Sequence, residues 1–408
     1  MSRVPGNGNL RLLRVLGTNV RHGAPMELVA PKKSLLRLLQ RCQGVADKKS
    51  TMPVLANVLL SAEGAELRVA ATDLYLAVSG TLEAEVKRPG SIAVPARDLF
   101  ERVRHMPEGP IKVSVTSGAA LTLQSIGSAR RYTLHGLPGA DFPQLPEPSA
   151  DAPAMQLTVQ TLKLLLERTH FSISSDETRP HLNSALFECR ANKGQQPGVV
   201  RMVTTDGHRL SKMEVTVPEL AAEATLLVPL KGVQELRKLL DEVQENRETT
   251  FVSISQTGPN AFFALAGIRF SVKLIDAQFP PYEQVIPAVS SRAVRAPRLA
   301  FCDALRAVSL AASDRTGGVK LAVSANALRI TSESPESGNG FDELGVDYDG
   351  PEVSVGFNAR YLLDVLMAME SDEDITLGLS GELDPAVVRP AMHSEAGDYI
   401  AVVMPMRI

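Results

Sequence analysis

A repeat with a period of about 130 residues constrains the fold of this chain more than any other feature of its sequence. One landmark is an aliphatic–Arg–apolar segment that runs on to a Thr-Asp or Ser-Glu end. A second has apolar residues at helical spacing, and a third is a short Phe-Pro motif. A period this long is too large for a solenoid, so each copy is predicted to be a whole domain. The landmarks are 67-LRVAATD-73, 200-VRMVTTD-206 and 328-LRITSES-334; 94–106, 228–240 and 357–369; and 141-DFPQL-145 and 278-QFPPY-282.

The repeat predicts three tandem domains, at 26–147, 154–288 and 296–408. A chain of 408 residues is too long for one ordinary core, and the junctions are rich in proline and small polar residues. Residues 1–25 carry four arginines and no acid, and they lack the apolar core of a signal peptide. We interpret 1–25 as a disordered basic leader or an upstream translation start. A basic arm that touches DNA is the alternative.

Each repeat has the same expected composition of elements. An amphipathic helix comes first, several alternating strands follow, and a second helix lies among them. Asn358 stands where it can cap the last of these second helices. Helices over antiparallel strands predict the α+β class. The first helices are expected at 31–43, 159–171 and 298–310, and two of the strands at 65–71 and 111–117.

Cations gather on one face of the first expected helix, although the formal net charge of the chain is -3. Lys33, Arg37 and Arg41 recur at every fourth position, which places them on one helical face. A solvated surface is one explanation. If the repeats turn these helices toward a common centre, the cations can instead neutralise DNA phosphates without base contacts. The loop that follows adds Lys48 and Lys49. Lys163 repeats the cationic position more weakly in the second repeat, and Arg298, Arg306 and Arg315 lie on or near the first helix of the third.

Several kinds of chemistry are missing from the sequence. It has no P-loop, HExxH, GxSxG or EF-hand motif, and its histidines lack metal-ligand spacing. Its three cysteines form no CxxC pair, which fits a reducing cytoplasm. No apolar run has the length of a membrane span. The absence of tryptophan argues against a protein that stacks single-stranded bases. We therefore expect no metal, no cofactor and no catalytic residue.

The repeat, together with seven segments, resembles the bacterial DNA sliding clamp family, the beta subunits of DNA polymerase III. The resemblance covers essentially all of 26–408. The segments are 52-MPVLANVLL-60, 71-ATDLYLAVSG-80, 94-VPARDLF-100, 135-HGLPGADFPQL-145, 204-TTDGHRL-210, 273-KLIDAQFPPY-282 and 402-VVMPMRI-408.

The resemblance implies a processivity factor that performs no chemistry, although it belongs to a DNA-directed DNA polymerase (a nucleotidyltransferase). Two chains join head to tail into a ring, with helices lining a channel and antiparallel sheets outside. The ring encircles double-stranded DNA without sequence preference. It tethers the polymerase and so raises its effective concentration at the primer. The implied partners are a second copy of the chain, duplex DNA, the DNA polymerase III catalytic subunit, the clamp loader, and other polymerases and repair proteins with clamp-binding peptides. No membrane partner is expected.

The resemblance also implies site residues. Gln284 departs from the arginine that relatives often carry, and Pro180 and His181 depart from aromatics; the first concerns partner affinity, the second DNA contact. The implied partner-peptide pocket consists of Leu182, Thr205, Gly207, His208, Arg209, Leu210, Pro280, Val285, Val402, Val403, Met404, Pro405, Met406 and Arg407, with Ala386 or Val387 nearby. DNA contact is expected at Lys49, Arg179 and His181, to which the helix argument adds Lys33 and Arg37. The ring-closing faces are expected at Tyr132 and Leu134 of one chain and Leu310 and Ala311 of the next.

Two alternatives stay open at this stage. One is a hydrolase in which Asp206 and His208 act as an acid–base pair, although no nucleophile accompanies them. The other is a DNA-free scaffold of triplicated domains. The repeat bears on the first, because 71-ATDLYLAVS-79 keeps the Thr-Asp but has Leu74 and Tyr75 where Gly207 and His208 stand. We therefore expect the Thr-Asp to be structural and 207–210 to carry the function.

Overall fold

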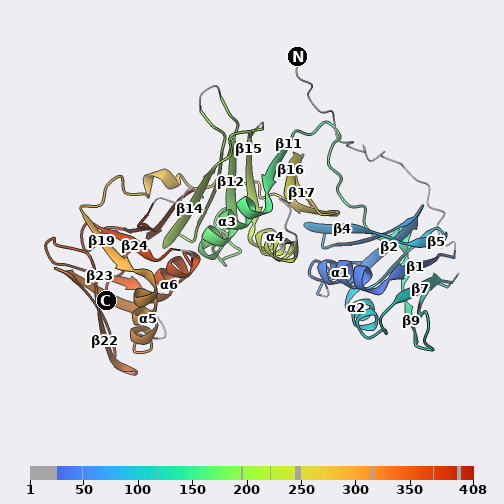
Figure 1. Cartoon of the computed structure of the whole chain (residues 1–408), viewed down its shortest axis with the longest axis horizontal. Coiled ribbons are helices and arrows are strands. Elements are labelled where there is room, and N and C mark those ends of the chain that lie inside the picture. The colour runs from blue at the N-terminus through green and yellow to red at the C-terminus, as the bar shows by residue number, and fades with distance from the viewer. Residues whose placement is uncertain are drawn as a thin grey trace, which may run out of the picture. The chain divides into compact units, whose positions relative to one another are not determined.

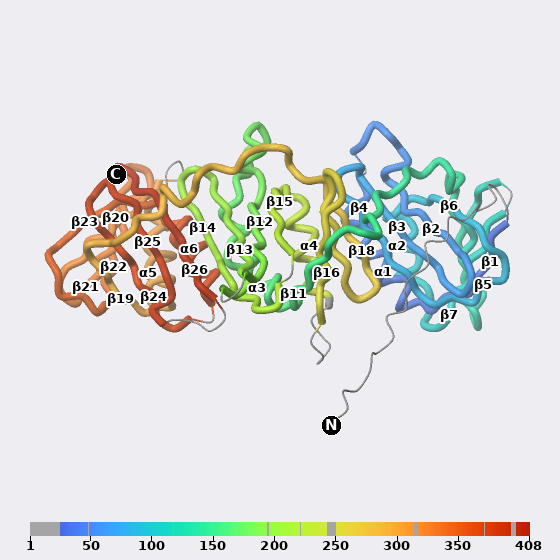
Figure 2. Tube along the Cα trace, turned by 90° about the horizontal axis from the view of Figure 1, so that it is seen from above, coloured from blue at the N-terminus to red at the C-terminus, as the bar shows by residue number. Residues whose placement is uncertain are grey.

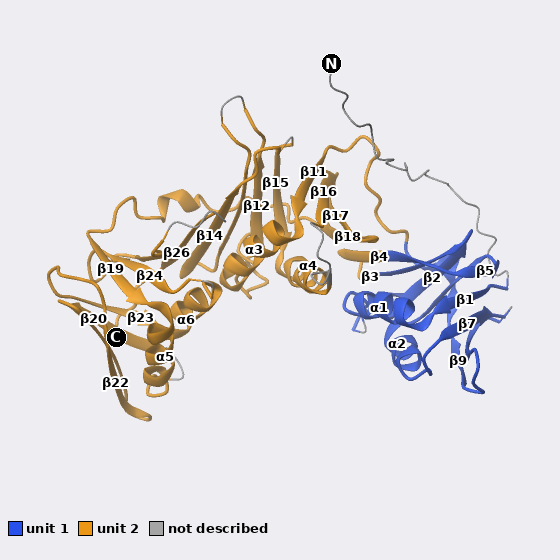
Figure 3. Ribbon diagram, in the orientation of Figure 1, with its two compact units in different colours: residues 1–71, 80–143 blue, residues 72–79, 144–408 orange. Residues whose placement is uncertain are grey.

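The structure is a computed structural model, which describes residues 25–47, 49–116, 118–193, 196–220, 222–243, 250–313, 317–370, 372–392 and 397–408 (Figure 1). The expected leader up to residue 24 lies outside the described residues, as do Lys48 and Arg315. The chain forms two compact units (Figure 3). The first consists of residues 1–71 and 80–143, and the second of residues 72–79 and 144–408. The three domain boundaries expected from the repeat stay predictions.

The first unit combines two antiparallel groups of strands with two helices that pack against each other, α1 (Lys32–Gln43) and α2 (Ala96–Arg104). One group has the order β5-β1-β7-β8-β9, and the other the order β10-β6-β2-β3. The strands are β1 (Glu27–Pro31), β2 (Asn57–Glu63), β3 (Glu66–Thr72), β5 (Glu85–Arg88), β6 (Gly90–Pro95), β7 (Pro110–Val115), β8 (Ala120–Ser125), β9 (Arg131–His135) and β10 (Leu137–Pro138).

Helix α1 shows how the sequence pattern becomes a buried face. Its buried apolar residues recur three and four positions apart, so that they form one stripe toward the strands. Lys33 and Arg37 lie on the exposed side, as the charge pattern predicts. Lys32 is buried, and its Nζ donates to Met106 O at 2.6 Å and to Glu108 Oε1 at 2.7 Å. The apolar stripe consists of Leu35, Leu38, Leu39 and Cys42.

The second unit contains an eight-stranded antiparallel sheet with the order β15-β12-β13-β14-β26-β25-β24-β19. Strands from the middle and the end of the chain therefore belong to one sheet, because β14 pairs with β26 (Figure 2). The strands are β12 (Ser184–Arg190), β13 (Val199–Thr205), β14 (Arg209–Thr216), β15 (Ala224–Pro229), β19 (Arg292–Pro297), β24 (Asp374–Leu379), β25 (Ala386–Pro390) and β26 (Asp398–Val403).

Two further groups of strands complete the second unit. One has the order β18-β17-β16-β11, and β4 begins beside β18, where Lys273 N donates to Tyr75 O. The other has the order β22-β21-β20-β23. Their bounds are β4 (Leu76–Glu83), of which residues 76–79 belong to this unit, β11 (Ala154–Thr158), β16 (Phe251–Thr257), β17 (Asn260–Leu265), β18 (Ile268–Lys273), β20 (Gly318–Ser324), β21 (Ala327–Ser334), β22 (Gly338–Gly345) and β23 (Val353–Asn358).

Three helices cover one face of the eight-stranded sheet (Figure 1). Helix α4 packs on β12 and β15, α3 on β13 and β14, and α6 on β26. Helix α5 packs against α6 and against β21 and β22. Their bounds are α3 (Val159–Thr169), α4 (Leu230–Val243), α5 (Arg298–Ser309) and α6 (Ala359–Ala368). The α+β class with helices on one side of antiparallel strands is confirmed.

All six expected helices form, but their place in each repeat differs in one respect. A short strand precedes each first helix, namely β1, β11 and β19, so the expectation that the helix comes first is wrong. These strands are only five or six residues long, which leaves little room for an alternating pattern. The predicted cap is confirmed, because Asn358 Oδ1 accepts from Arg360 N at 2.9 Å.

Two cations of the expected phosphate-binding set have other roles. Lys163 Nζ lies 2.8 Å from Asp241 and 3.5 Å from Glu167, and the hydrogen bond to Asp241 raises the Lys163 pKa. Arg298 is buried and donates to the carbonyl oxygens of Glu370 and Asp372 after α6. These two positions are corrections, because charge and spacing alone do not reveal a partner that comes from a distant helix. Arg306 is exposed, as expected.

Candidate functional site

The segment Thr205–Arg209 is a tight turn between β13 and β14, and its first two side chains hold it. Thr205 Oγ1 donates to Arg209 O at 2.7 Å and accepts from Gly207 N at 3.1 Å. Asp206 Oδ1 accepts from the backbone N–H of both His208 and Arg209, each at 2.9 Å. Gly207 has a φ of 90°, in the left-handed region that favours glycine. The prediction that Thr-Asp is structural is confirmed.

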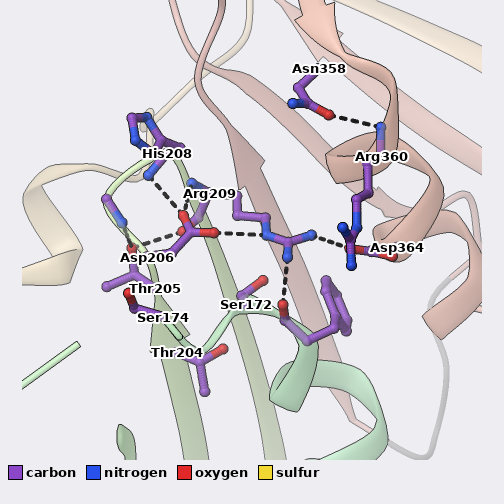
Figure 4. Close-up of polar contacts among 12 residues, drawn as sticks. Ser172, Ser174, Thr204, Thr205, Asp206, His208, Arg209, Asn358, Arg360 and Asp364 are labelled. Carbon is purple, nitrogen blue, oxygen red and sulfur yellow. Dashed lines mark hydrogen bonds and ion pairs between the residues drawn. The ribbon is translucent and has the colours of Figure 1, made fainter. Parts of the chain in front are cut away.

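Arg209 leaves this turn and points into the protein, where each nitrogen of its guanidinium has a hydrogen-bond partner (Figure 4). Its Nε lies 3.1 Å from Asp206 Oδ2, and its Nη1 lies 2.5 Å from Asp364 Oδ2 on α6. Its Nη2 donates to Phe171 O at 2.6 Å. A buried guanidinium is tolerated only when its charge and its donors are matched in this way. Arg209 therefore fastens the turn to α6.

Aromatic rings complete the surroundings of Arg209. Its guanidinium carbon lies 4.6 Å from the ring centre of Tyr361 and 5.5 Å from that of Phe171, within reach of cation–π attraction. The exposed His208 ring stacks on Tyr361, with centroids 6.3 Å apart and planes 18° apart. Burial raises the pKa of Tyr361, so its phenol stays neutral in the physiological range.

The last strand of the chain brings the C-terminal segment to the same turn. Leu210 stands opposite Val402 and Arg209 opposite Val403 in the pairing of β14 with β26. One step further, Met404 N donates to His208 O at 2.8 Å. Met406 N then donates to Gly356 O at 2.8 Å, where a side chain on Gly356 would collide with the tail. The two ends of the expected pocket therefore meet through backbone hydrogen bonds.

An apolar cluster lies beneath this junction. Leu210 and Val402 pack in it, and the half-buried Val285 packs against it. The other buried members are Leu186, Val203, Leu227 and Tyr282, and the partly buried Ile275, Phe279 and Ile286 pack on their outer side. The geometry thus joins residues of β14, β26 and the segment after β18 in one apolar surface.

The expected pocket residues fall into three groups, which are buried, half-buried and exposed. Thr205, Arg209 and Leu210 are buried, and the first two bind the turn itself. Gly207 and His208 are exposed. Leu182 is buried in the loop before β12, where its backbone pairs with Arg179 and Ser174. Arg407 is exposed. The half-buried residues, which offer part of their surface, are Pro280, Val285, Met404, Pro405 and Met406. The remaining residues are buried, namely Val402, Val403, Ala386 and Val387.

Three residues of the site escaped the sequence interpretation: Phe171, Tyr361 and Asp364. All three come from elements far in sequence from the Asp-Gly-His-Arg turn, so the motif itself contains no trace of them. A weak signal exists in the third copy of the second helix, because Tyr361 and Asp364 are three positions apart on a helix and share one face.

The acid–base alternative is not supported by this geometry. Both carboxylate oxygens of Asp206 are committed to the turn and to Arg209, and the His208 group that Asp206 binds is the backbone N–H. Among the residues that the structure describes, no group of three or more His, Cys, Asp or Glu could hold a metal ion. No described helix is long and apolar enough to cross a membrane.

The expected DNA and interface residues are mostly at the surface. Lys33, Arg37 and Lys49 are exposed. Arg179 is exposed and its Nε lies 2.7 Å from Asp176 Oδ2, while His181 is half-buried. Of the interface residues, Leu310 is 83% exposed and Tyr132 is half-buried, whereas Leu134 and Ala311 are buried within the chain.

Comparison with known families and proteins agrees with this architecture. Three family descriptions match the chain: the DNA polymerase III beta subunit N-terminal domain at residues 26–146, its central domain at 156–281 and its C-terminal domain at 283–407. The beta sliding clamp of Caulobacter vibrioides is 35% identical over 83% of this chain and 90% of its own length. That of Escherichia coli strain K12 is 32% identical over 94% of this chain and all of its own length.

Solved structures give the same result. A sliding clamp from Bartonella birtlesii, bound to griselimycin, has a TM-score of 0.86 and 31% identity over 94% of this chain and all of its own. A clamp from Pseudomonas aeruginosa, with ligand, has a TM-score of 0.85 with the same identity and coverage. The chain therefore belongs to the DNA polymerase III beta subunit family and is a DNA sliding clamp, a processivity factor rather than an enzyme.

Proposed function

We propose that two copies of this chain close head to tail into a ring around duplex DNA and hold partner proteins through a peptide pocket at the junction of β14 and β26. The observation that carries the pocket is the joining of the Asp-Gly-His-Arg-Leu turn to the C-terminal segment over one apolar cluster. A concave apolar surface with a few fixed polar groups suits the capture of short apolar peptides. The proposed partners are the polymerase catalytic subunit, the clamp loader and other DNA-processing proteins.

The exposed and half-buried residues of the pocket support this role. His208 presents an aromatic ring at its edge, and Val285 and Pro280 line the side contributed by the segment after β18. Met404 and Met406 supply flexible thioether side chains that adapt to different apolar ligands. Thr205 and Arg209 act as supports in this proposal, because their polar atoms already bind the protein.

Two sheet edges support ring closure. Strand β9 is the last strand of its group in the first unit, and β22 is the last of its group in the second. An edge strand presents unpaired N–H and C=O groups, so two such edges can pair across a subunit boundary. Leu310, directly after α5, is 83% exposed, and Phe341 on β22 is 66% exposed. The neighbouring subunit would cover both side chains. Tyr132 on β9 is the matching aromatic.

The exposed cations of α1 support the contact with DNA. Lys33 and Arg37 on α1 and Lys49 in the loop after it are exposed and can approach phosphates. Arg179, which pairs with Asp176, and the half-buried His181 add to them from the loop before β12. Phosphate contacts carry no base information, as a sliding ring requires. We also propose a cytoplasmic location, in keeping with three buried, free cysteines.

Retention on closed circular DNA tests the ring. After loading, the protein should stay on a circle and leave as soon as the circle is linearised, because only a closed template traps a ring. Size-exclusion chromatography of the full chain checks that it is a dimer. Equal loss from both templates would contradict the ring.

Deletion of Met404–Ile408 tests the pocket. The shortened protein should remain a dimer that is retained on circular DNA, yet lose stimulation of the polymerase. Retained stimulation would contradict the pocket assignment.

Exchange of Lys33, Arg37 and Lys49 to glutamine should flatten the dependence of DNA retention on salt, because fewer counterions are then released.

A further inference from the structure

A cavity of about 610 Å³ lies beside the proposed peptide pocket, and apart from Pro280 its lining residues are not among the proposed pocket residues. Its floor is formed by β12 and β15, and the segment 274–283 covers it from the side. The turn between β16 and β17 closes one end with Gly258 and Pro259. The cavity is therefore built from three parts of the second unit that the sequence places far apart.

The cavity and the peptide pocket share a wall. Leu186, Leu227 and Tyr282 line the cavity and also belong to the apolar cluster that contains Leu210 and Val402. A peptide whose apolar side chain reaches that cluster therefore has the cavity as its immediate neighbour. This continuity makes the next residues of the same peptide the natural occupants of the cavity.

The far side of the cavity is acidic. Glu188 Oε2 accepts from Tyr282 Oη at 3.0 Å and from Arg201 Nη1 at 3.2 Å. Arg201 also gives its Nε and Nη2 to Glu214, so its charge is shared between two carboxylates. Burial raises the pKa of Tyr282, so its hydroxyl stays protonated. The buried phenol thus holds the Glu188 carboxylate at the cavity wall.

The rim carries the same sign of charge. Asp276 and Glu283 are exposed there, and the described residues that line the cavity include three carboxylates but no Lys, Arg or His. Phe279, half-buried on the covering segment, meets Tyr282 edge to face with ring centroids 6.3 Å apart. An aromatic face beside carboxylates favours a planar cation, which stacks on the ring and donates to the acids.

We propose that this cavity is a subsite for an arginine side chain that flanks the apolar anchor of the docking peptide. The inference rests on the proposed function, since it assigns a second contact to the same peptide. The aliphatic part of the arginine would lie along Leu227 and Phe279, and its guanidinium would face Glu188 and Asp276. The subsite thereby selects, among apolar peptides, those with a basic flank.

Fluorescence anisotropy with the full-length protein tests this subsite. The probes are labelled peptides with one apolar anchor and one flanking residue, placed on either side of it. This residue is arginine, or citrulline, which has the same shape without the charge. Arginine should bind about 5- to 10-fold more tightly than citrulline at one of the two positions, as expected for a charge-assisted contact that is partly exposed. The preference should shrink at high salt.

Protein variants locate the effect. Glu188→Gln should reduce the arginine preference to about 2-fold or less. Because Glu188 also contacts Arg201, the surface pair Asp276→Asn with Glu283→Gln provides a second test that keeps the contact between Glu188 and Arg201. The exposed Glu219→Gln, which does not line the cavity, is the matched control and should keep the full preference.

The outcomes separate the two proposals. Equal binding of arginine and citrulline peptides at both positions would overturn the subsite and leave the peptide pocket standing. A preference that survives in both Glu188→Gln and the rim double variant would also overturn it, because the cation would then bind elsewhere. If no peptide bound at all, the peptide pocket would fail, and the subsite with it.

Discussion

Two turns of this clamp, Thr72–Leu76 and Thr205–Arg209, share one set of hydrogen bonds and differ in what their side chains reach. In each, the threonine Oγ1 donates to the carbonyl oxygen four residues on, at 2.7 Å. In each, one carboxylate oxygen of the aspartate accepts two backbone N–H groups. The third residue has a positive φ in both, 76° at Leu74 and 90° at Gly207. The backbone of the turn is therefore a repeated structural element.

The difference lies in the second carboxylate oxygen. Asp73 uses it to bind Lys231 of α4, a side chain that is half exposed. Asp206 uses it to bind the buried Arg209, which continues to Asp364 on α6. The first turn thus ends in an ion pair with a half-exposed lysine, and the second in a buried network at the proposed pocket. The two turns therefore share a backbone conformation, and the three residues that follow Thr-Asp determine which side chains the aspartate binds.

The largest test of this comparison is the pair Asp206→Ala and Asp73→Ala. Loss of Asp206 leaves two N–H groups and part of a buried guanidinium without an acceptor, which should cost about 3 kcal/mol of unfolding free energy. Loss of Asp73 removes the same two backbone contacts but frees only a solvated lysine, so about 1.5 kcal/mol is expected. Urea unfolding of both variants measures the difference. Equal losses would show that the Arg209 network adds nothing to the turn.

The paired turns also show what the sequence could predict. Thr-Asp recurs at the repeat spacing, so its structural role followed from comparing two copies of the chain with each other. The partners of Arg209 did not follow, because Phe171 and Asp364 lie on helices whose positions only the folded sheet defines. Arg298 was misplaced for the same reason: an arginine on an amphipathic helix gives no sign that carbonyl oxygens after another helix will bind it.

The exchange of each threonine for valine tests whether the two turns are equivalent. Valine keeps the shape of threonine but removes the hydroxyl, so the N–H of the third turn residue loses its acceptor. The carbonyl oxygen loses one of its two donors and keeps the backbone N–H of the aspartate. We expect Thr72→Val and Thr205→Val each to lower the unfolding free energy by about 1 to 2 kcal/mol. The prediction is the equality of the two values. A difference much larger than about 0.5 kcal/mol would mean that the surroundings, and not the turn, set the cost.

Gly207→Ala tests the third position of the pocket turn. Alanine at a φ of 90° is strained, whereas the space around a new Cβ is open apart from Arg179 Nη1 at 3.9 Å. The expected cost is therefore conformational and about 1 kcal/mol. Thermal unfolding measures this cost. The affinity for an apolar peptide should change little, because the substitution moves the backbone of the turn only slightly. A much larger loss of stability would point to a collision rather than to backbone strain.

The smallest effect is expected for Leu74→Gly, the reverse change in the first turn. Relief of the positive φ should stabilise the fold, but glycine also gains freedom in the unfolded chain, and the two contributions nearly cancel. Leu74 is 53% exposed, so little burial is lost. A net gain of about 0.5 kcal/mol is expected. Leu74→Asn separates the contributions, because asparagine tolerates the left-handed region without the extra freedom of glycine. If backbone strain is the difference between the turns, asparagine stabilises at least as much as glycine; if asparagine destabilises, the exposed leucine makes a contact that its position in the turn does not reveal.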